Sequence, residues 1–183
     1  MKKNSVQRTI MESMREIVFG LEDSLVSTLG ALTGIAIGAQ STYIVILSGL
    51  VLLAAEGMSM AAGSYLSSKS AFETERLLHE QDRKDFDHKA NPVRAGIVMG
   101  LFYFLGGMVP LAPYFFFSIQ TALFLSIPST AIVLFLVGVW SATYTRRSAL
   151  RSGSEMVIIS LSAALIGYLI ARAVSWYFGV DVG

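Results

Sequence analysis

Cysteine is absent from this chain of 183 residues, and histidine occurs only at His79 and His88. Without cysteine there can be no disulfide, no thiolate metal site and no thiol nucleophile. The sequence also has no Gly-x-Ser-Gly run and no His-Glu-x-x-His motif, so hydrolytic nucleophiles and zinc ligands are poorly supplied. These absences argue against an enzyme, and we expect no prosthetic group.

Charge is also scarce. Charged residues make up 15% of the chain, hydrophobic residues make up 54%, and the mean hydropathy is +0.60. Soluble domains carry about 25% charged residues, so the composition favours a membrane protein in contact with a lipid bilayer. The net charge of +1 gives no indication of a nucleic-acid partner. Residues 1–16 lack the basic-then-apolar order of a signal peptide, so we expect the first apolar segment to be retained.

Five apolar segments are long enough to cross a bilayer, which takes about 20 residues. They are residues 17–38, 43–65, 93–115, 123–144 and 156–178. We therefore predict an all-α integral membrane protein with five transmembrane helices in a single transmembrane domain. Only a few residues separate the first two spans, which predicts an antiparallel hairpin. Pro110 and Pro113 predict that the third helix bends or unwinds near its end.

The basic residues predict the topology. Of the 14 Lys and Arg residues, all but Arg172 lie before the first span or in, or at the edges of, the connections that follow the second and fourth spans. The positive-inside rule then places the N-terminus in the cytoplasm and the C-terminus outside. We expect Arg172 to reach the outer interface beside Trp176 and Tyr177. The short ends favour a prokaryotic cytoplasmic membrane, or a vacuolar membrane if the source is eukaryotic.

Residues 67–91 form the longest polar segment, on the predicted cytoplasmic side. Acids and bases alternate along it, which is typical of a solvated helix or linker. Its Glu, Asp and His side chains also permit a second interpretation, a small metal-collecting segment. The pattern alone leaves both interpretations open.

Three carboxylates share one face of the first predicted helix. At about 100° per residue, Glu12, Glu16 and Asp23 fall within about 40° of one another, whereas Glu22 points about 100° away. The same stripe continues upward as small residues: Ser27, Gly30, Gly34 and Gly38. Glycines at this spacing let helices approach closely in lipid. The stripe therefore predicts a packing face that also holds acids, and in a homodimer the acids of both copies would line one seam.

The second predicted helix carries Glu56 and Met60 on one face, with Met58 nearly opposite. A carboxylate with a thioether suits a borderline cation better than calcium or magnesium. We rank ferrous iron first, with manganese, cobalt and zinc behind it. Three structural interpretations stay open: Met60 as core filler, Glu12 and Glu16 as charges at a helix N-terminus, and Asp23 as part of a buried ion pair or as a protonated acid.

Several segments resemble the vacuolar iron transporter family. Residues 15–27 (REIVFGLEDSLVS) and 55–67 (AEGMSMAAGSYLS) are similar to its first two helices. Residues 91–95 (NPVRA) and 106–114 (GGMVPLAPY) look like its third helix, and residues 147–156 (RSALRSGSEM) look like the start of its fifth. The motifs occur in the family's order and cover nearly the whole chain.

The resemblance implies a dimer of five-helix subunits that exports ferrous iron and related divalent metals from the cytoplasm in exchange for protons. It implies a path along the dimer interface with Asp23 and Met60 as metal ligands, and with Glu12 and Glu16 at the cytoplasmic mouth. The chain departs from the family at Ser64, where a glutamate is usual, and at Ser24, where glycine is common. It also lacks the large cytoplasmic domain of typical members. In this respect the chain resembles the shorter nodulin-like branch of the family.

The candidate metal ligands are therefore Asp23, Met60, Glu12, Glu16 and Glu56. Burial raises the pKa of a lone carboxylate and a bound dication lowers it, so metal and proton compete for such a group. That competition is the minimum requirement for metal/proton exchange. The alternative hypothesis is a membrane protein that binds metal or assembles with a partner without transporting anything.

Overall fold

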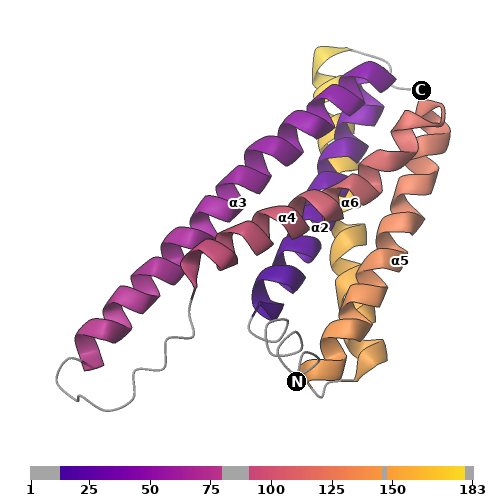
Figure 1. Cartoon of the computed structure of the whole chain (residues 1–183). Coiled ribbons are helices and arrows are strands. Elements are labelled where there is room, and N and C mark those ends of the chain that lie inside the picture. Colours follow the sequence, from indigo (N-terminus) through magenta and orange to yellow (C-terminus); the bar gives the residue numbers. More distant parts are fainter. Residues whose placement is uncertain (1–12, 80–90, 146–147, 180–183) are drawn as a thin grey trace.

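The computed structural model of the chain describes residues 13–79, 91–145 and 148–179. These residues are all-helical, as predicted (Figure 1). They form α2 (Met14–Ala39), α3 (Thr42–His79), α4 (Pro92–Leu111), the short 3-10 helix η1 (Ala112–Phe115), α5 (Ile119–Thr145) and α6 (Ala149–Phe178). Helices α2, α4 and α6 run in one direction and α3 and α5 in the other (Figure 1).

Helix α2 lies at the centre of the bundle and packs against each of the other long helices. Its most extensive contacts are with α4 and α6, and α4 also packs along α3. One core cluster joins α2, α3, α4, η1 and α5 through buried side chains that include Leu32, Leu53, Tyr103 and Tyr114. The candidate residues on α2 and α3 therefore lie on the two helices that flank α4.

The predicted hairpin between the first two helices is present. Helix α2 ends at Ala39 and α3 begins at Thr42. Gln40 adopts a left-handed conformation with φ of 47°, and its backbone N–H donates to the carbonyl oxygen of Ala36. This arrangement satisfies a carbonyl that would otherwise lack a partner at the end of the helix. The chain thus reverses direction over two residues.

Helix α3 does not end at residue 65, where the predicted second span ends, but continues to His79. Its 38 residues span about 57 Å at about 1.5 Å per residue, well beyond a hydrocarbon core of about 30 Å. The first half of the polar segment 67–91 is therefore helical, and Figure 1 shows it projecting away from the bundle. No glycine or proline occurs between Gly63 and residue 91, and Lys69 pairs with Glu73 one turn later at 3.9 Å. His88 and the other residues of 80–90 lie outside the described part.

Helix α4 begins and ends at the residues that the sequence marks. The Asn91 side chain accepts a hydrogen bond from the Arg94 backbone N–H at 3.1 Å, and Pro92 occupies the first turn. At the other end, Pro110 lies just before the last helical residue, Leu111, and the tighter 3-10 turn η1 follows. The helix therefore changes geometry where the prolines predict it, because proline removes a backbone donor.

Four helical stretches are long and apolar enough to cross a membrane: Thr42–Thr74, Pro92–Phe115, Ile119–Thr143 and Ala149–Phe178. Only 17% of the most apolar stretch of α6 is buried within the protein, so most of that apolar surface faces outward. Helix α2 is absent from this set because Glu22 and Asp23 and several Ser, Thr and Gly residues lower its hydropathy. The chain is a multi-pass membrane protein.

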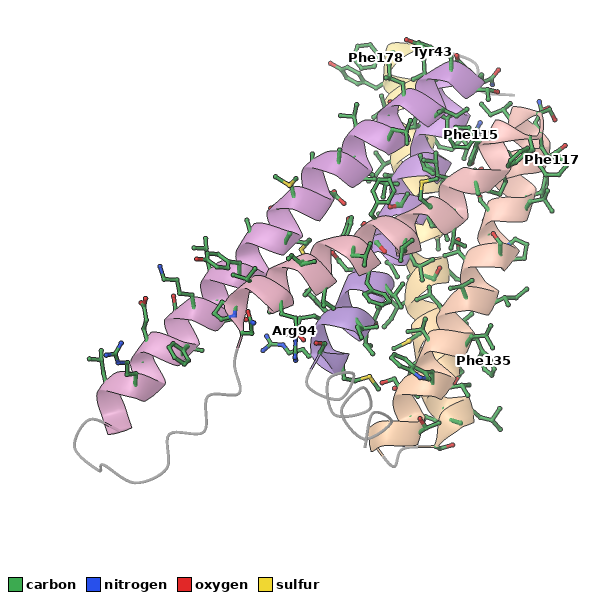
Figure 2. The ribbon with its side chains drawn as sticks, in the orientation of Figure 1. Tyr43, Arg94, Phe115, Phe117, Phe135 and Phe178 are labelled. Atoms are coloured by element: carbon green, nitrogen blue, oxygen red, sulfur yellow. The ribbon has the colours of Figure 1, made fainter. Side chains whose placement is uncertain are left out.

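The two ends of the bundle differ in composition. Exposed aromatic side chains gather at one end, where Figure 2 labels Tyr43, Phe115, Phe117 and Phe178. Arg94 lies toward the other end, at the start of α4 (Figure 2). Among the described residues, the first turns of α2 and α6 at this end carry Arg15 and Arg151, and the projecting part of α3 carries Lys69 and Arg76. Aromatic residues favour membrane interfaces and basic residues favour the cytoplasmic side.

Candidate metal site

Glu56 of α3 is held by hydroxyl groups from the two neighbouring helices. The Tyr103 hydroxyl on α4 donates a hydrogen bond to Glu56 Oε2, and the Ser27 hydroxyl on α2 donates to the same oxygen at 3.3 Å. The two hydroxyl oxygens lie 2.9 Å apart. Three helices thus meet at one oxygen of this half-buried carboxylate, which gains the hydrogen-bond partners that a polar group needs within an apolar bundle.

Asp23 lies within electrostatic range of this cluster. Its carboxylate interacts with Glu56, with Glu22 and with the Tyr103 hydroxyl. Two carboxylates close together in a medium of low dielectric repel each other unless a cation or a proton intervenes. The cluster of Asp23, Glu56, Ser27 and Tyr103, hereafter the oxygen cluster, is therefore chemically suited to hold positive charge.

Glu16 and Met60 belong to a second group of side chains. Both line a cavity of about 430 Å³ between α2, α3 and α4, together with Met99 and several serines. One carboxylate oxygen of Glu16, Oε2, is buried and has no hydrogen-bond partner among the described residues. Met60 also packs against the core cluster of α2, α3 and α4. Its thioether thus serves both packing and the wall of the cavity, hereafter the methionine cavity.

The two groups follow the antiparallel register of α2 and α3. Glu16 precedes Asp23 by two turns of α2, and Met60 follows Glu56 by one turn of α3. Because the two helices run in opposite directions, both Glu16 and Met60 lie toward the end of the bundle where α2 begins. The methionine cavity and the oxygen cluster are therefore successive levels along one helix pair, separated by about 6–10 Å at about 1.5 Å per residue.

The glycine stripe of α2 packs against α6 of the same chain. A Cβ placed on Gly30 would lie 3.0 Å from the carbonyl oxygen of Ala163, and one on Gly34 would lie 3.1 Å from that of Gly167. The stripe is thus a helix-packing face, as predicted, and α6 covers part of it. An open apolar groove of about 790 Å³ remains along α2 and α6, and Ser27, Gly30 and Gly34 line it.

The structure places four of the five candidate ligands. Asp23 and Glu56 lie in the oxygen cluster, Glu16 and Met60 line the methionine cavity, and Glu12 lies outside the described residues. Met58 is 74% exposed, on the opposite side of α3 as the helical wheel indicates. Within residues 13–79, 91–145 and 148–179, no three His, Cys, Asp or Glu side chains converge as a metal site.

Tyr103 is the member of the site that sequence reasoning missed. It is fully buried and lies near the middle of the third predicted span. Between Arg94 and Tyr114, it is the one residue whose side chain can form a strong hydrogen bond. A tyrosine hydroxyl so far from a membrane interface needs a buried partner, and that signal was available in the sequence.

Similar proteins align with most of this chain. The model of the VIT family matches residues 14–89 and 77–172. An uncharacterised protein of Methanocaldococcus jannaschii is 30% identical over 170 residues, covering 87% of this chain and 88% of its own length. Vacuolar iron transporter homolog 4 of Arabidopsis thaliana is 29% identical over 176 residues, covering 93% of this chain and 84% of its own length.

The alignment with a third relative is longer than this chain. Vacuolar iron transporter 1 of Oryza sativa subsp. japonica is 23% identical over 216 aligned positions, covering 89% of this chain and 86% of its own length. Because 216 exceeds the 183 residues of this chain, the rice protein contains residues that this chain lacks. The family model also matches in two parts that overlap at residues 77–89, within the polar segment 67–91. The chain belongs to the VIT family, as a short form.

Proposed function

We propose that the chain transports ferrous iron, and also manganese, cobalt or zinc, out of the cytoplasm in exchange for protons. The observation that carries the proposal is the oxygen cluster, in which Asp23 and Glu56 lie within electrostatic range inside a bundle of apolar helices. Charged groups are expensive at membrane depth and mark ion pathways when they face a bundle interior. The names of the plant relatives supply the cargo, iron.

The proposed path runs along α2 and α3. A cation enters at the end of the bundle where α2 begins, passes Glu16 and Met60 in the methionine cavity, and then reaches Asp23 and Glu56. As the sequence predicts, we assign Glu12, which lies outside the described residues, to the cytoplasmic mouth of this path. A carboxylate that binds a proton loses its attraction for a cation, so protons arriving from the far side release the metal. Each carboxylate binds either a proton or the metal cation, and exchange between these two states requires no other chemical change.

The proposed topology has five spans, with the N-terminus in the cytoplasm. Four spans follow from hydropathy, and we propose α2 as the fifth because it packs against all four other long helices. Two features at opposite ends of the bundle support the orientation. The described basic residues gather mainly where α2, α4 and α6 begin, and the exposed aromatic residues gather at the other end.

The proposed functional unit is a homodimer. One chain supplies only two acids to the oxygen cluster, and a transition-metal site needs more donors than that. A second copy placed along the open groove of α2 and α6 would bring its own polar stripe to the same seam, because Ser27 lines that groove. The acids of two copies would then complete the coordination shell of one cation.

Flux measured in proteoliposomes tests the proposal. We expect saturable uptake of Fe²⁺ that follows an imposed pH gradient, with Mn²⁺, Co²⁺ and Zn²⁺ ranked beside it. Asp23→Ala should abolish the flux while the protein stays folded, and Glu73→Ala, a change on the projecting part of α3, is the matched control. Undiminished flux in Asp23→Ala would remove Asp23 from the path.

The alternative is a membrane protein that binds metal or assembles with a partner but does not transport. This alternative predicts metal binding to the purified protein with no metal-dependent proton movement in vesicles. A pH-sensitive dye trapped in the same proteoliposomes separates transport from binding alone. Uptake of metal in exchange for protons removes protons from the lumen, so the luminal pH should rise in step with metal flux.

A further inference from the structure

Met99 of α4 lines the methionine cavity together with Met60 of α3 and Glu16 of α2. The Met99 side chain is only 6% exposed, whereas other apolar side chains of α4, such as Ile97 and Leu101, face outward. Its sulfur lies against α2 at Gly20, where an added Cβ would be 3.4 Å from Met99 Sδ. Gly20 follows Glu16 by one helical turn, so the sulfur lies against the same face of α2 that carries the Glu16 carboxylate.

Each of the three helices thus contributes one donor to the cavity: a carboxylate from α2, a thioether from α3 and a thioether from α4. The Glu16 Oε2 atom is buried without a hydrogen-bond partner among the described residues. A buried carboxylate oxygen normally has a partner, so this atom independently points to a cation. The serine hydroxyls that line the same cavity add neutral oxygen donors.

We propose that Met99 is a second thioether ligand in the methionine cavity, and that the pair Met60 and Met99 biases the protein toward softer divalent cations. Thioethers favour the softer metals, whereas Mn²⁺ and Mg²⁺ prefer oxygen donors. The pair therefore selects Fe²⁺, Co²⁺ and Zn²⁺ over Mn²⁺. This inference rests on the proposed function for its consequence in transport, but the binding site can be tested without transport.

A packing role for Met99 makes a different prediction. Methionine fills irregular gaps in cores, and replacing it with leucine conserves volume and is well tolerated. A gap filler replaced by leucine would leave the metal preference unchanged. A ligand replaced by leucine would lose the soft donor and keep the fold.

The first experiment compares Co²⁺ and Mn²⁺ uptake in proteoliposomes, because both ions are stable in air. We expect Met99→Leu to lower the preference for Co²⁺ over Mn²⁺, measured as the ratio of apparent affinities, by roughly tenfold, the lower end of what lost metal-site interactions cause. Met108→Leu is the matched control, since Met108 lies on the same helix and packs against the core cluster instead. A ratio that is equal in Met99→Leu and the wild type would overturn the proposal.

The second experiment needs neither transport nor a folded Met99 variant. X-ray absorption of Co²⁺ bound to the purified wild-type protein counts sulfur neighbours of the metal. We expect two sulfur neighbours in the wild type and one in Met60→Leu, the remaining one being Met99. One sulfur neighbour in the wild type and none in Met60→Leu, or none in either, would overturn the proposal. If wild-type flux is absent while two sulfur neighbours are found, the transport proposal fails and the site stands.

Discussion

Replacing Tyr103 by phenylalanine removes one oxygen atom from the oxygen cluster and leaves the ring in place. The lost hydroxyl donates to Glu56 Oε2 and lies 2.9 Å from Ser27 Oγ. In the variant, Glu56 keeps the hydrogen bond from the Ser27 hydroxyl at 3.3 Å. We expect the carboxylate of Glu56 to gain rotamer freedom and the bundle to lose one interhelical hydrogen bond between α3 and α4.

The substitution should change two quantities, the free energy of unfolding and the apparent KM for metal. Interhelical hydrogen bonds in membrane proteins contribute about 0.6 kcal/mol on average and about 1.7 kcal/mol at most. A bond to a carboxylate belongs at the upper end, so we expect the free energy of unfolding to fall by about 1–2 kcal/mol. Ordering a freed side chain on binding costs about 0.5–1.5 kcal/mol, which corresponds to an apparent KM for metal that rises roughly two- to tenfold. The maximal rate should change little.

The stability change is measured by unfolding in mixed micelles and the KM by metal uptake into proteoliposomes. Tyr114→Phe is the matched control, because Tyr114 is also buried, at 1% exposure, and lies in η1 outside the oxygen cluster. Its substitution should leave KM unchanged. An unchanged or lower KM in folded Tyr103→Phe would show that the hydroxyl does not position Glu56 for the cation. A fall in stability alone would not restore that role for the Tyr103 hydroxyl.

Two further predictions concern helix packing and the projecting part of α3. A Cβ on Gly167 would collide with the Gly30 backbone, whereas one on Gly38 meets nothing within 4 Å. Gly167→Ala should therefore lower the free energy of unfolding in mixed micelles by about 1–3 kcal/mol. Gly38→Ala should not lower it. Equal effects of the two would contradict the tight crossing of α2 and α6. The pair Lys69 and Glu73 is solvent-exposed, so Glu73→Gln should change thermal stability by less than about 0.5 kcal/mol, and a larger loss would indicate that this part of α3 packs against something.

Hydropathy and breakers predicted the elements well, because both act locally. The hairpin between α2 and α3 and the change of helix geometry after Pro110 depend on residues within a few positions of each other. The length of α3 was harder to predict. A membrane-length window ends near residue 65, but a helix ends only where a cap or breaker stops it, and the residues up to His79 contain neither glycine nor proline after Gly63.

The sequence predicted which face of its helix each candidate residue occupies, but not which residues of other helices it meets. Helical wheels correctly gave the faces of Glu56, Met60 and Met58, since those follow from the period of one helix. Which residues meet across helices depends on register, and a wheel contains no register. The wheels therefore did not show that Asp23 belongs with Glu56 whereas Glu16 belongs with Met60, or that α6 of the same chain covers Gly30 and Gly34.

The difference between the two levels bears on how the proposed transporter releases its cargo. The methionine cavity offers sulfur and one acid, and the oxygen cluster offers two acids and two hydroxyls. Neither level in one chain provides a full coordination shell. Incomplete coordination suits a transport path, because conduction requires binding that is strong enough to admit an ion yet weak enough to release it. Sulfur at the first level discriminates among metals, whereas the oxygen donors of the second level bind cations and protons alike. Selectivity and proton exchange would then reside at different depths of the same helix pair, so a substitution at Met99 should change which metal is moved without changing its coupling to protons.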